Sequence, residues 1–292
     1  MAFKTINFDL FKLKLPADSP VKFKDLFESL SVNYIPMSKD SKTILRTIDF
    51  IDKGDWILGA IDNIQMTDLP NQTDVKTQET NPLNIPDTSG LSFPTCFLYD
   101  KELDMVAFES GKNKLTFNNF CAYFEYIHNI KEIQTEIVLD PVDYAKLANI
   151  NYISKFSVKI VKLQTGTVFH SKKKAVSNII KAADDTDNSV LDLTLSSGLS
   201  RKSLKVSTIK NYITSLLSFK DSEEVTKIEI NGREENEEHG TVLNFIENKV
   251  RFAIDVERKR NESENSIFEK LALLQTAYLK RRHDLLKSYK EK

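Results

Sequence analysis

The amino-acid sequence predicts an α+β protein with mixed sheets and flanking helices. Segments in which apolar and polar residues alternate, as in strands, are interspersed with segments in which apolar residues recur at helical spacing. Hydrophobic residues make up 40% of the 292 residues and charged residues 28%. This composition provides enough apolar side chains for a buried core and excludes a wholly disordered chain.

The first 150 residues are expected to form an acidic α+β domain. Residues 2–15 alternate like a strand, but the apolar positions change parity near Leu10, which indicates a bulge or a strand buried on both faces. Asp140 and Pro141 suit the N-cap and the first turn of a helix. Further strands are expected at 43–51, 54–66, 91–99, 103–109 and 133–139, and helices at 21–31, 115–128 and 141–149.

Residues 67–90 interrupt this pattern. They contain three prolines, many threonines and asparagines, and almost no apolar periodicity. Such a composition predicts a long mobile loop. A surface excursion without a function of its own is the simpler interpretation.

Residues 151–292 are expected to form a basic α+β domain for DNA binding and dimerisation. Strands are expected at 151–163, 189–195, 225–230 and 241–256, and helices at 171–183, 206–218 and 263–290. The apolar residues of the last helix follow heptad spacing: Ile267, Leu271, Leu274, Tyr278 and Leu285. This stripe predicts a homodimer, with packing on the body of its own chain as the alternative.

Charge is unevenly distributed along the chain, although the formal net charge is only −1. Residues 1–154 carry a net charge of −7, 155–220 of +8, 221–248 of −7 and 249–292 of +5. Such asymmetry points to a polyanionic partner, because the field around a protein depends on where its charges lie. Solvated helix faces are the alternative explanation for the charge runs.

Two clusters of basic residues and a C-terminal pair are the candidate DNA contacts. Lysine and arginine neutralise phosphates without reading the base sequence. One face of the strand at 151–163 presents two lysines, and the acid-free segment 199–210 leads into a helix start, where backbone N–H groups add positive potential. Arg201 has an alternative partner in the acidic loop at 184–187. The candidates are Lys155, Lys159, Lys172, Lys173, Lys174, Arg201, Lys202, Lys205, Lys210, Arg281 and Arg282.

Signatures of catalysis are scarce, so the sequence predicts a protein that is not an enzyme. The eight glycines are spread singly and form no phosphate-binding loop, and the four histidines lie in no metal-binding motif. Cys96 and Cys121 lie on apolar segments, as buried small side chains do. We expect no cofactor and no metal. The weak alternative is a metal-dependent nuclease built from Glu136, Asp140, Asp143 and Lys146, but a helix start attracts aspartate in any case.

The expected location is the cytoplasm. With only two cysteines there is no disulfide framework. No apolar run approaches the roughly 20 residues needed to cross a bilayer. Charged residues interrupt the alternating N-terminal segment, so we expect no signal peptide there.

The segment LSFPTCFLYDKELDMVAFESGKNKLTFNNF at 91–120 resembles the RexA-like family of phage-exclusion proteins. The similarity continues through NYISKFSVKIVK and SVLDLTL, through the basic segment LSRKSLKVSTIK at 199–210, and through the final LLKSYKEK, and it covers about two thirds of the chain. The DNA-binding subunit of the Kiwa defence system has a comparable layout. The chain departs from the family in the 67–90 loop and in the acidic turn at 233–238.

This resemblance implies a homodimeric DNA-binding protein that acts in the exclusion of infecting phage. It also implies that DNA-contacting basic residues lie before and within the helix that follows Arg201, Lys202 and Lys205. The leading expectation is therefore a sensor or regulator of anti-phage defence that binds double-stranded DNA without sequence preference. The competing expectation is a protein-interaction component that recruits a membrane or effector partner.

Overall fold

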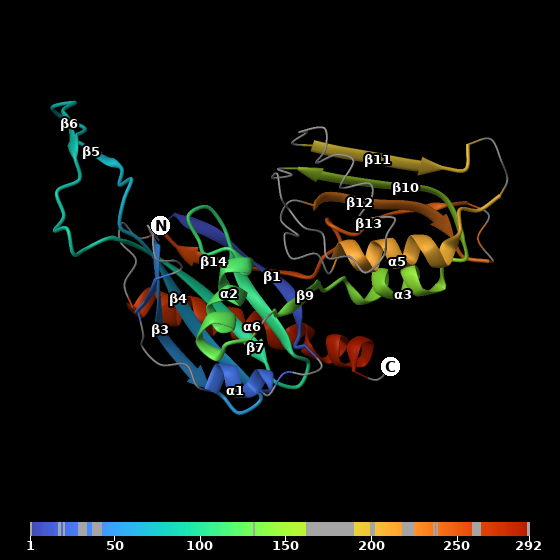
Figure 1. Ribbon diagram of the computed structural model, residues 1–292, viewed down its shortest axis with the longest axis horizontal. Helices are drawn as coiled ribbons and strands as arrows, with labels where there is room; N and C mark the ends of the chain where they lie inside the picture. Colours follow the sequence, from blue (N-terminus) through green and yellow to red (C-terminus); the bar gives the residue numbers. More distant parts are fainter. Residues whose placement is uncertain are drawn as a thin grey trace. The chain divides into compact units, whose positions relative to one another are not determined.

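The computed structural model of the protein (Figure 1) divides into two compact units. Unit 1 comprises Met1–Ile133 and Arg251–Lys292, and unit 2 comprises Gln134–Val250. The C-terminal segment, which we expected in the second domain, thus belongs to the first unit. The structure describes residues 2–16, 19, 21–28, 34–36, 43–130, 132–161, 190–198, 202–217, 225–235, 237, 239–258 and 264–290.

Unit 1 is built on an antiparallel sheet with the strand order β14-β1-β8-β7-β4-β3-β2. The strands are β1 (Phe3–Lys14), β2 (Tyr34–Pro36), β3 (Thr43–Asp52), β4 (Trp56–Gln65), β7 (Leu91–Asp100), β8 (Met105–Ser110) and β14 (Arg251–Glu257). The helices of this unit are α1 (Phe23–Glu28), α2 (Phe117–His128) and α6 (Glu264–Tyr289). The α+β class that the sequence predicts is confirmed.

Helices α2 and α6 cover opposite faces of this sheet. The Phe97 ring lies 5.2 Å from Phe120 of α2, whereas Asp100, an odd number of residues further along β7, bonds to Tyr278 of α6. Buried residues therefore occupy consecutive positions from Phe8 to Phe11 of β1. The parity change near Leu10 reflects burial on both faces, because the pairings of β1 with β8 and β14 run without a register shift.

The heptad stripe of the last helix is buried within unit 1. Its residues are at most 6% exposed, and α6 packs against β14, β7 and β4. The five stripe residues are Ile267, Leu271, Leu274, Tyr278 and Leu285. Of the two alternatives for this stripe, packing on the body of its own chain is the observed one.

The 67–90 segment contains a small hairpin of β5 (Asn71–Thr73) and β6 (Thr80–Pro82), drawn at the far left of Figure 1. The side chain of Asp74 forms the turn by accepting hydrogen bonds from the backbone N–H groups of Lys76 and Thr77, at 2.7 and 3.0 Å. Gln78 completes it with a positive φ of 61°. An aspartate side chain that bonds to the following backbone stabilises a turn without apolar periodicity, and for this reason the sequence pattern missed the hairpin.

Unit 2 contains an antiparallel sheet with the strand order β11-β10-β12-β13. Its elements are β9 (Gln134–Ile137), α3 (Pro141–Asn149), β10 (Tyr152–Val161), β11 (Val190–Ser196), α5 (Val206–Leu217), β12 (Val225–Arg233) and β13 (Thr241–Asn244). Helix α5 lies along the sheet (Figure 1) and buries Ile209, Ile213 and Leu216. Asp140 is the N-cap of α3 and Pro141 its first residue, as predicted.

The sequence prediction for residues 241–256 is wrong, because this segment is not one strand. It forms β13 in unit 2 and β14 in unit 1. The chain turns between them because Asn244 Oδ1 accepts hydrogen bonds from the N–H groups of Ile246 and Glu247, at 3.2 and 3.3 Å. The helix expected at 171–183, with Lys172, Lys173 and Lys174, lies outside the described residues, and so do the 184–187 loop and Arg201.

Candidate nucleic-acid interface

Lys155 and Lys159 lie on the same face of β10, as the alternation predicts. The opposite face carries Phe156, Val158 and Ile160, which are buried toward the α5 side. Lys155 is exposed and Lys159 is half-buried. The two ammonium groups thus project from the sheet face that α5 does not cover.

The chain after β11 returns to the first residues of β10. The N–H of Ser197 donates to the carbonyl of Ser154 at 2.9 Å, and the N–H of Leu204 donates to the carbonyl of Ile153 at 2.8 Å. Ser203 Oγ accepts from the N–H of Ile153 at 2.9 Å. These bonds hold residues 202–205 beside the start of β10.

This return joins the two basic clusters that are separated in the sequence. Lys202 and Lys205 are exposed and flank Ser203 and Leu204, while Lys155 follows two residues after Ile153. We call Lys155, Lys202 and Lys205 the basic corner. The carbonyl of Lys205 also accepts from the N–H of Ile209, so the corner leads directly into α5.

Lys210 has a structural role in the same unit. Its Nζ donates to the carbonyl of Ala148 at 2.6 Å, in the last turn of α3. A lysine at this place satisfies a carbonyl that the helix itself leaves without a partner and complements the helix dipole. Partial burial lowers the pKa of Lys210. Its ammonium group is therefore engaged within the fold, and we leave it out of the candidate interface.

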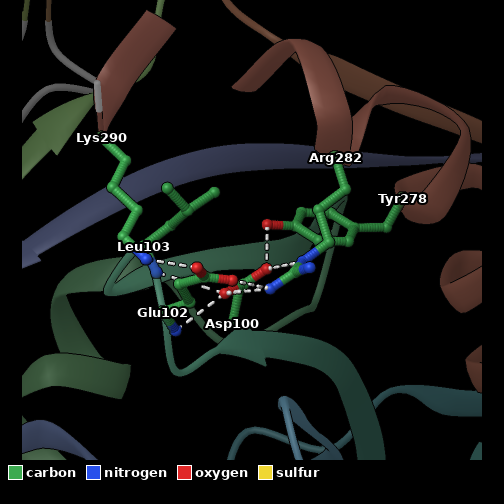
Figure 2. Close-up of polar contacts among 6 residues, drawn as sticks. All are labelled: Asp100, Glu102, Leu103, Tyr278, Arg282 and Lys290. Atoms are coloured by element: carbon green, nitrogen blue, oxygen red, sulfur yellow. Dashed lines mark hydrogen bonds and ion pairs between the residues drawn. The ribbon is translucent and has the colours of Figure 1, made fainter. Parts of the chain in front are cut away.

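Arg281 and Arg282 lie on α6 in unit 1, and Arg282 is bound by carboxylates (Figure 2). Its Nε donates to Asp100 Oδ2 and its Nη2 to Glu102 Oε2, both at 2.6 Å. The hydrogen bonds that Arg282 donates to Asp100, and then to Glu102, raise the pKa of Arg282. The geometry therefore does not support our prediction that Arg282 contacts DNA, because this guanidinium already donates hydrogen bonds to two carboxylates, those of Asp100 and Glu102.

A polar pocket of about 310 Å³ lies beside the basic corner in unit 2. We call it the Tyr152 pocket. The Arg233 guanidinium lies over the Tyr152 ring, 4.8 Å from its centroid, and these residues face each other across β10 and β12. Lys155 lies opposite Asn231 in the same register. The lining residues are Tyr152, Ser154, Asn231, Gly232, Arg233 and Gly240. No sequence motif predicted this pocket, because the pairing of β10 with β12 brings its lining residues together.

The residues of the weak nuclease pattern have structural contacts. Asp140 Oδ1 accepts from the N–H of Val142 at 3.1 Å, and Lys146 pairs with Asp143 at 3.5 Å within α3. Across the part of the chain that the structure describes, no group of three or more His, Cys, Asp or Glu side chains is placed to hold a metal ion.

The two cysteines are buried in unit 1. Cys96 is 0% exposed and Cys121 is 2% exposed. Burial, and then the negative charge of Glu109, raise the pKa of the Cys96 thiol. A thiol in this environment is a poor nucleophile, because the thiolate is the reactive form.

Comparison with known proteins gives a match to a protein family. No curated protein and no solved structure matches the chain. None of the described helices combines the length and the apolar character that crossing a membrane requires. Residues 56–283 match the family of unknown function DUF6731, a span that includes parts of both units. The chain therefore belongs to the family of unknown function DUF6731.

Proposed function

We propose that this protein binds double-stranded DNA without sequence preference and acts as a sensor or regulator in anti-phage defence. Unit 2 provides the DNA surface in this proposal. The observation that carries it is a pair of hydrogen bonds, from the Ile153 N–H to Ser203 Oγ and from the Leu204 N–H to the Ile153 carbonyl, which bring the basic segment before α5 to the basic start of β10. Lysines gathered from two segments of the chain form a surface suited to phosphates.

The positive potential must be local, because unit 2 as a whole is neutral. Residues 134–250 contain 16 lysines and arginines and 16 aspartates and glutamates. Basic residues dominate 155–220, whereas acidic residues dominate 221–248. A phosphate backbone is therefore attracted to the basic corner and repelled by the acidic turn that follows Arg233.

Lysine-dominated contacts favour affinity without base readout. The described elements of unit 2 offer ammonium groups, and ammonium groups neutralise phosphates as point charges. The role in defence, the cytoplasmic location and the absence of an enzymatic activity extend this proposal from the resemblance to RexA-like proteins and from the sequence composition.

A gel-shift titration of the full chain with random-sequence duplex DNA over a salt series tests the proposal. We expect the logarithm of the affinity to fall linearly with the logarithm of the salt concentration, with a slope of several units. Unrelated duplexes should compete almost equally, whereas specific sites are preferred by roughly a thousandfold or more. The absence of a shift at low salt would refute DNA binding.

The competing proposal is a protein-interaction component that recruits a membrane or effector partner.

The homodimer also stays a prediction, although the α6 stripe that suggested it is buried within unit 1. Another surface would have to form the interface. Sedimentation at micromolar concentration tests this prediction, and a single species of 33.4 kDa would contradict it.

A further inference from the structure

The Tyr152 pocket has a stacking surface at its wall. The Arg233 guanidinium lies 4.8 Å from the centre of the Tyr152 ring. Strand pairing fixes both backbones, since the two residues are register partners, and both side chains are only half-buried. Aromatic rings and arginine planes of this kind are the surfaces on which unpaired nucleotide bases stack.

Gly240 leaves space for the Asn231 amide at the pocket wall, and Gly232 allows β12 to approach β10 closely. A Cβ at Gly240 would lie 2.4 Å from Asn231 Oδ1, and a Cβ at Gly232 would lie 2.8 Å from the carbonyl oxygen of Tyr152. A side chain at Gly240 would therefore displace Asn231 from the pocket wall. The Asn231 amide can donate and accept hydrogen bonds, as recognition of a base edge requires.

The size of the pocket suits one base. Its volume of about 310 Å³ is at the lower end of the range of roughly 300–1,000 Å³ for small-molecule sites. A ligand larger than a single nucleotide would have to extend out of the pocket along the sheet.

The surrounding charges orient such a ligand. On one side, Arg233 leads into a turn in which Arg233 Nη1 donates to the carbonyl of Glu237 at 3.4 Å, and the N–H of Glu234 donates to Glu237 Oε2 at 3.1 Å. The negatively charged carboxylates of Glu234 and Glu237 repel a phosphate. Toward the basic corner, Lys155 lies opposite Asn231. A neutral base therefore fits in the pocket while its phosphate faces Lys155.

We propose that the Tyr152 pocket binds one unpaired nucleotide base, stacked against the preformed Tyr152–Arg233 pair, of a DNA strand whose phosphates lie on the basic corner. This inference rests on the proposed DNA-binding function and adds to it a preference for single-stranded segments and frayed ends. Duplex DNA binds through its phosphates alone, because its bases remain stacked inside the helix.

Fluorescence anisotropy with labelled oligothymidine and with a blunt duplex tests the inference. We expect Tyr152→Ala to weaken oligothymidine binding about tenfold, since base–aromatic stacking commonly contributes this much. Tyr152→Phe keeps the ring and should bind like the unchanged protein. Blunt-duplex affinity should stay the same in both variants. Tyr126→Ala, which removes an exposed tyrosine from α2 of unit 1, is the matched control.

The outcomes separate this inference from the proposed function. Thermal melts of each variant report whether it folds. The double variant Tyr152→Phe, Gly240→Ala is a second way to disturb the pocket, one that keeps the aromatic ring. Equal oligothymidine affinity in Tyr152→Ala and in the unchanged protein overturns the pocket inference, as does an equal loss for both DNA forms. If the unchanged protein binds neither DNA form, the proposed function itself fails.

Discussion

Arg282 Nε donates a hydrogen bond to Asp100 Oδ2 at 2.6 Å, across 182 residues of sequence. Asp100 is fully buried at the end of β7 and also accepts from the Tyr278 hydroxyl at 3.0 Å and from the N–H groups of Glu102 and Leu103 (Figure 2). Lys290 adds a second cation to Glu102. This cluster attaches α6 to the turn between β7 and β8.

Removing the arginine should destabilise unit 1. Arg282→Ala leaves the Asp100 carboxylate buried without its cation, and we expect a loss of about 3 kcal/mol in the free energy of unfolding. Urea denaturation followed by circular dichroism measures this change. Lys280→Ala, an exposed change on the same helix, is the control and should cost at most about 1 kcal/mol. Equal stability of the two variants would contradict a stabilising role for the Asp100–Arg282 pair.

Changes in the basic corner should alter the salt dependence of DNA binding. We expect the triple change Lys155→Ala, Lys202→Ala and Lys205→Ala to reduce the salt slope by about three, because each lost phosphate contact lowers it by about one. Affinity for unrelated duplexes should fall by a similar factor, since no base readout is lost. A gel-shift salt series measures both quantities.

The control for this change is a triple variant with the same loss of charge in unit 1. Lys53, Lys76 and Lys112 are exposed there, and their combined change to alanine should leave the slope unaltered. If both triple variants lose the same affinity, net charge rather than the basic corner determines binding. If neither does, the DNA surface lies among other residues.

The thiols of Cys96 and Cys121 should be unreactive in the folded protein. Both are buried, and the raised pKa of Cys96 keeps this thiol protonated at neutral pH. We expect Ellman's reagent to label neither cysteine within minutes under native conditions and to label both after denaturation. Rapid labelling of the folded protein would show that one of them is accessible.

Asp104 should make stability depend on pH. Its carboxylate accepts from the Tyr99 hydroxyl at 2.8 Å, and partial burial raises its pKa above the ordinary value of 3.8. A carboxyl whose pKa is higher in the folded state destabilises the fold when charged, so this cost is present at neutral pH and disappears as the pH falls below about 3.8.

Replacement of Asp104 by asparagine should remove that cost. Asparagine also tolerates the positive φ of 52° at this position and can accept the Tyr99 hydrogen bond. We expect Asp104→Asn to have a higher Tm than the unchanged protein at pH 7, with the difference shrinking toward pH 3. Asp87→Asn, an exposed change in the same unit, should leave Tm unaltered. A lower Tm for Asp104→Asn at pH 7 would contradict this account.

Local patterns in the sequence were sufficient to predict most helices and strands. The alternation in β10 placed Lys155 and Lys159 on one face, and Asp140 with Pro141 marked the start of α3. These features depend on neighbouring residues only, because a cap bonds within one turn and a strand repeats every two residues. The sequence pattern did not predict the hairpin of β5 and β6, because the segment around the turn at Asp74 has no apolar repeat.

Only the tertiary structure decided which distant segments meet. In β14, Arg251 pairs with Asp9 of β1 and bonds to its carboxylate at 2.8 Å, which makes unit 1 discontinuous in sequence. The bond between Ile153 and Ser203 likewise gathers the basic corner. The sequence by itself determined most of the elements, their buried faces and the charge of each segment. The partners depended on packing of the whole chain, because a free strand edge can pair with any strand of matching pattern.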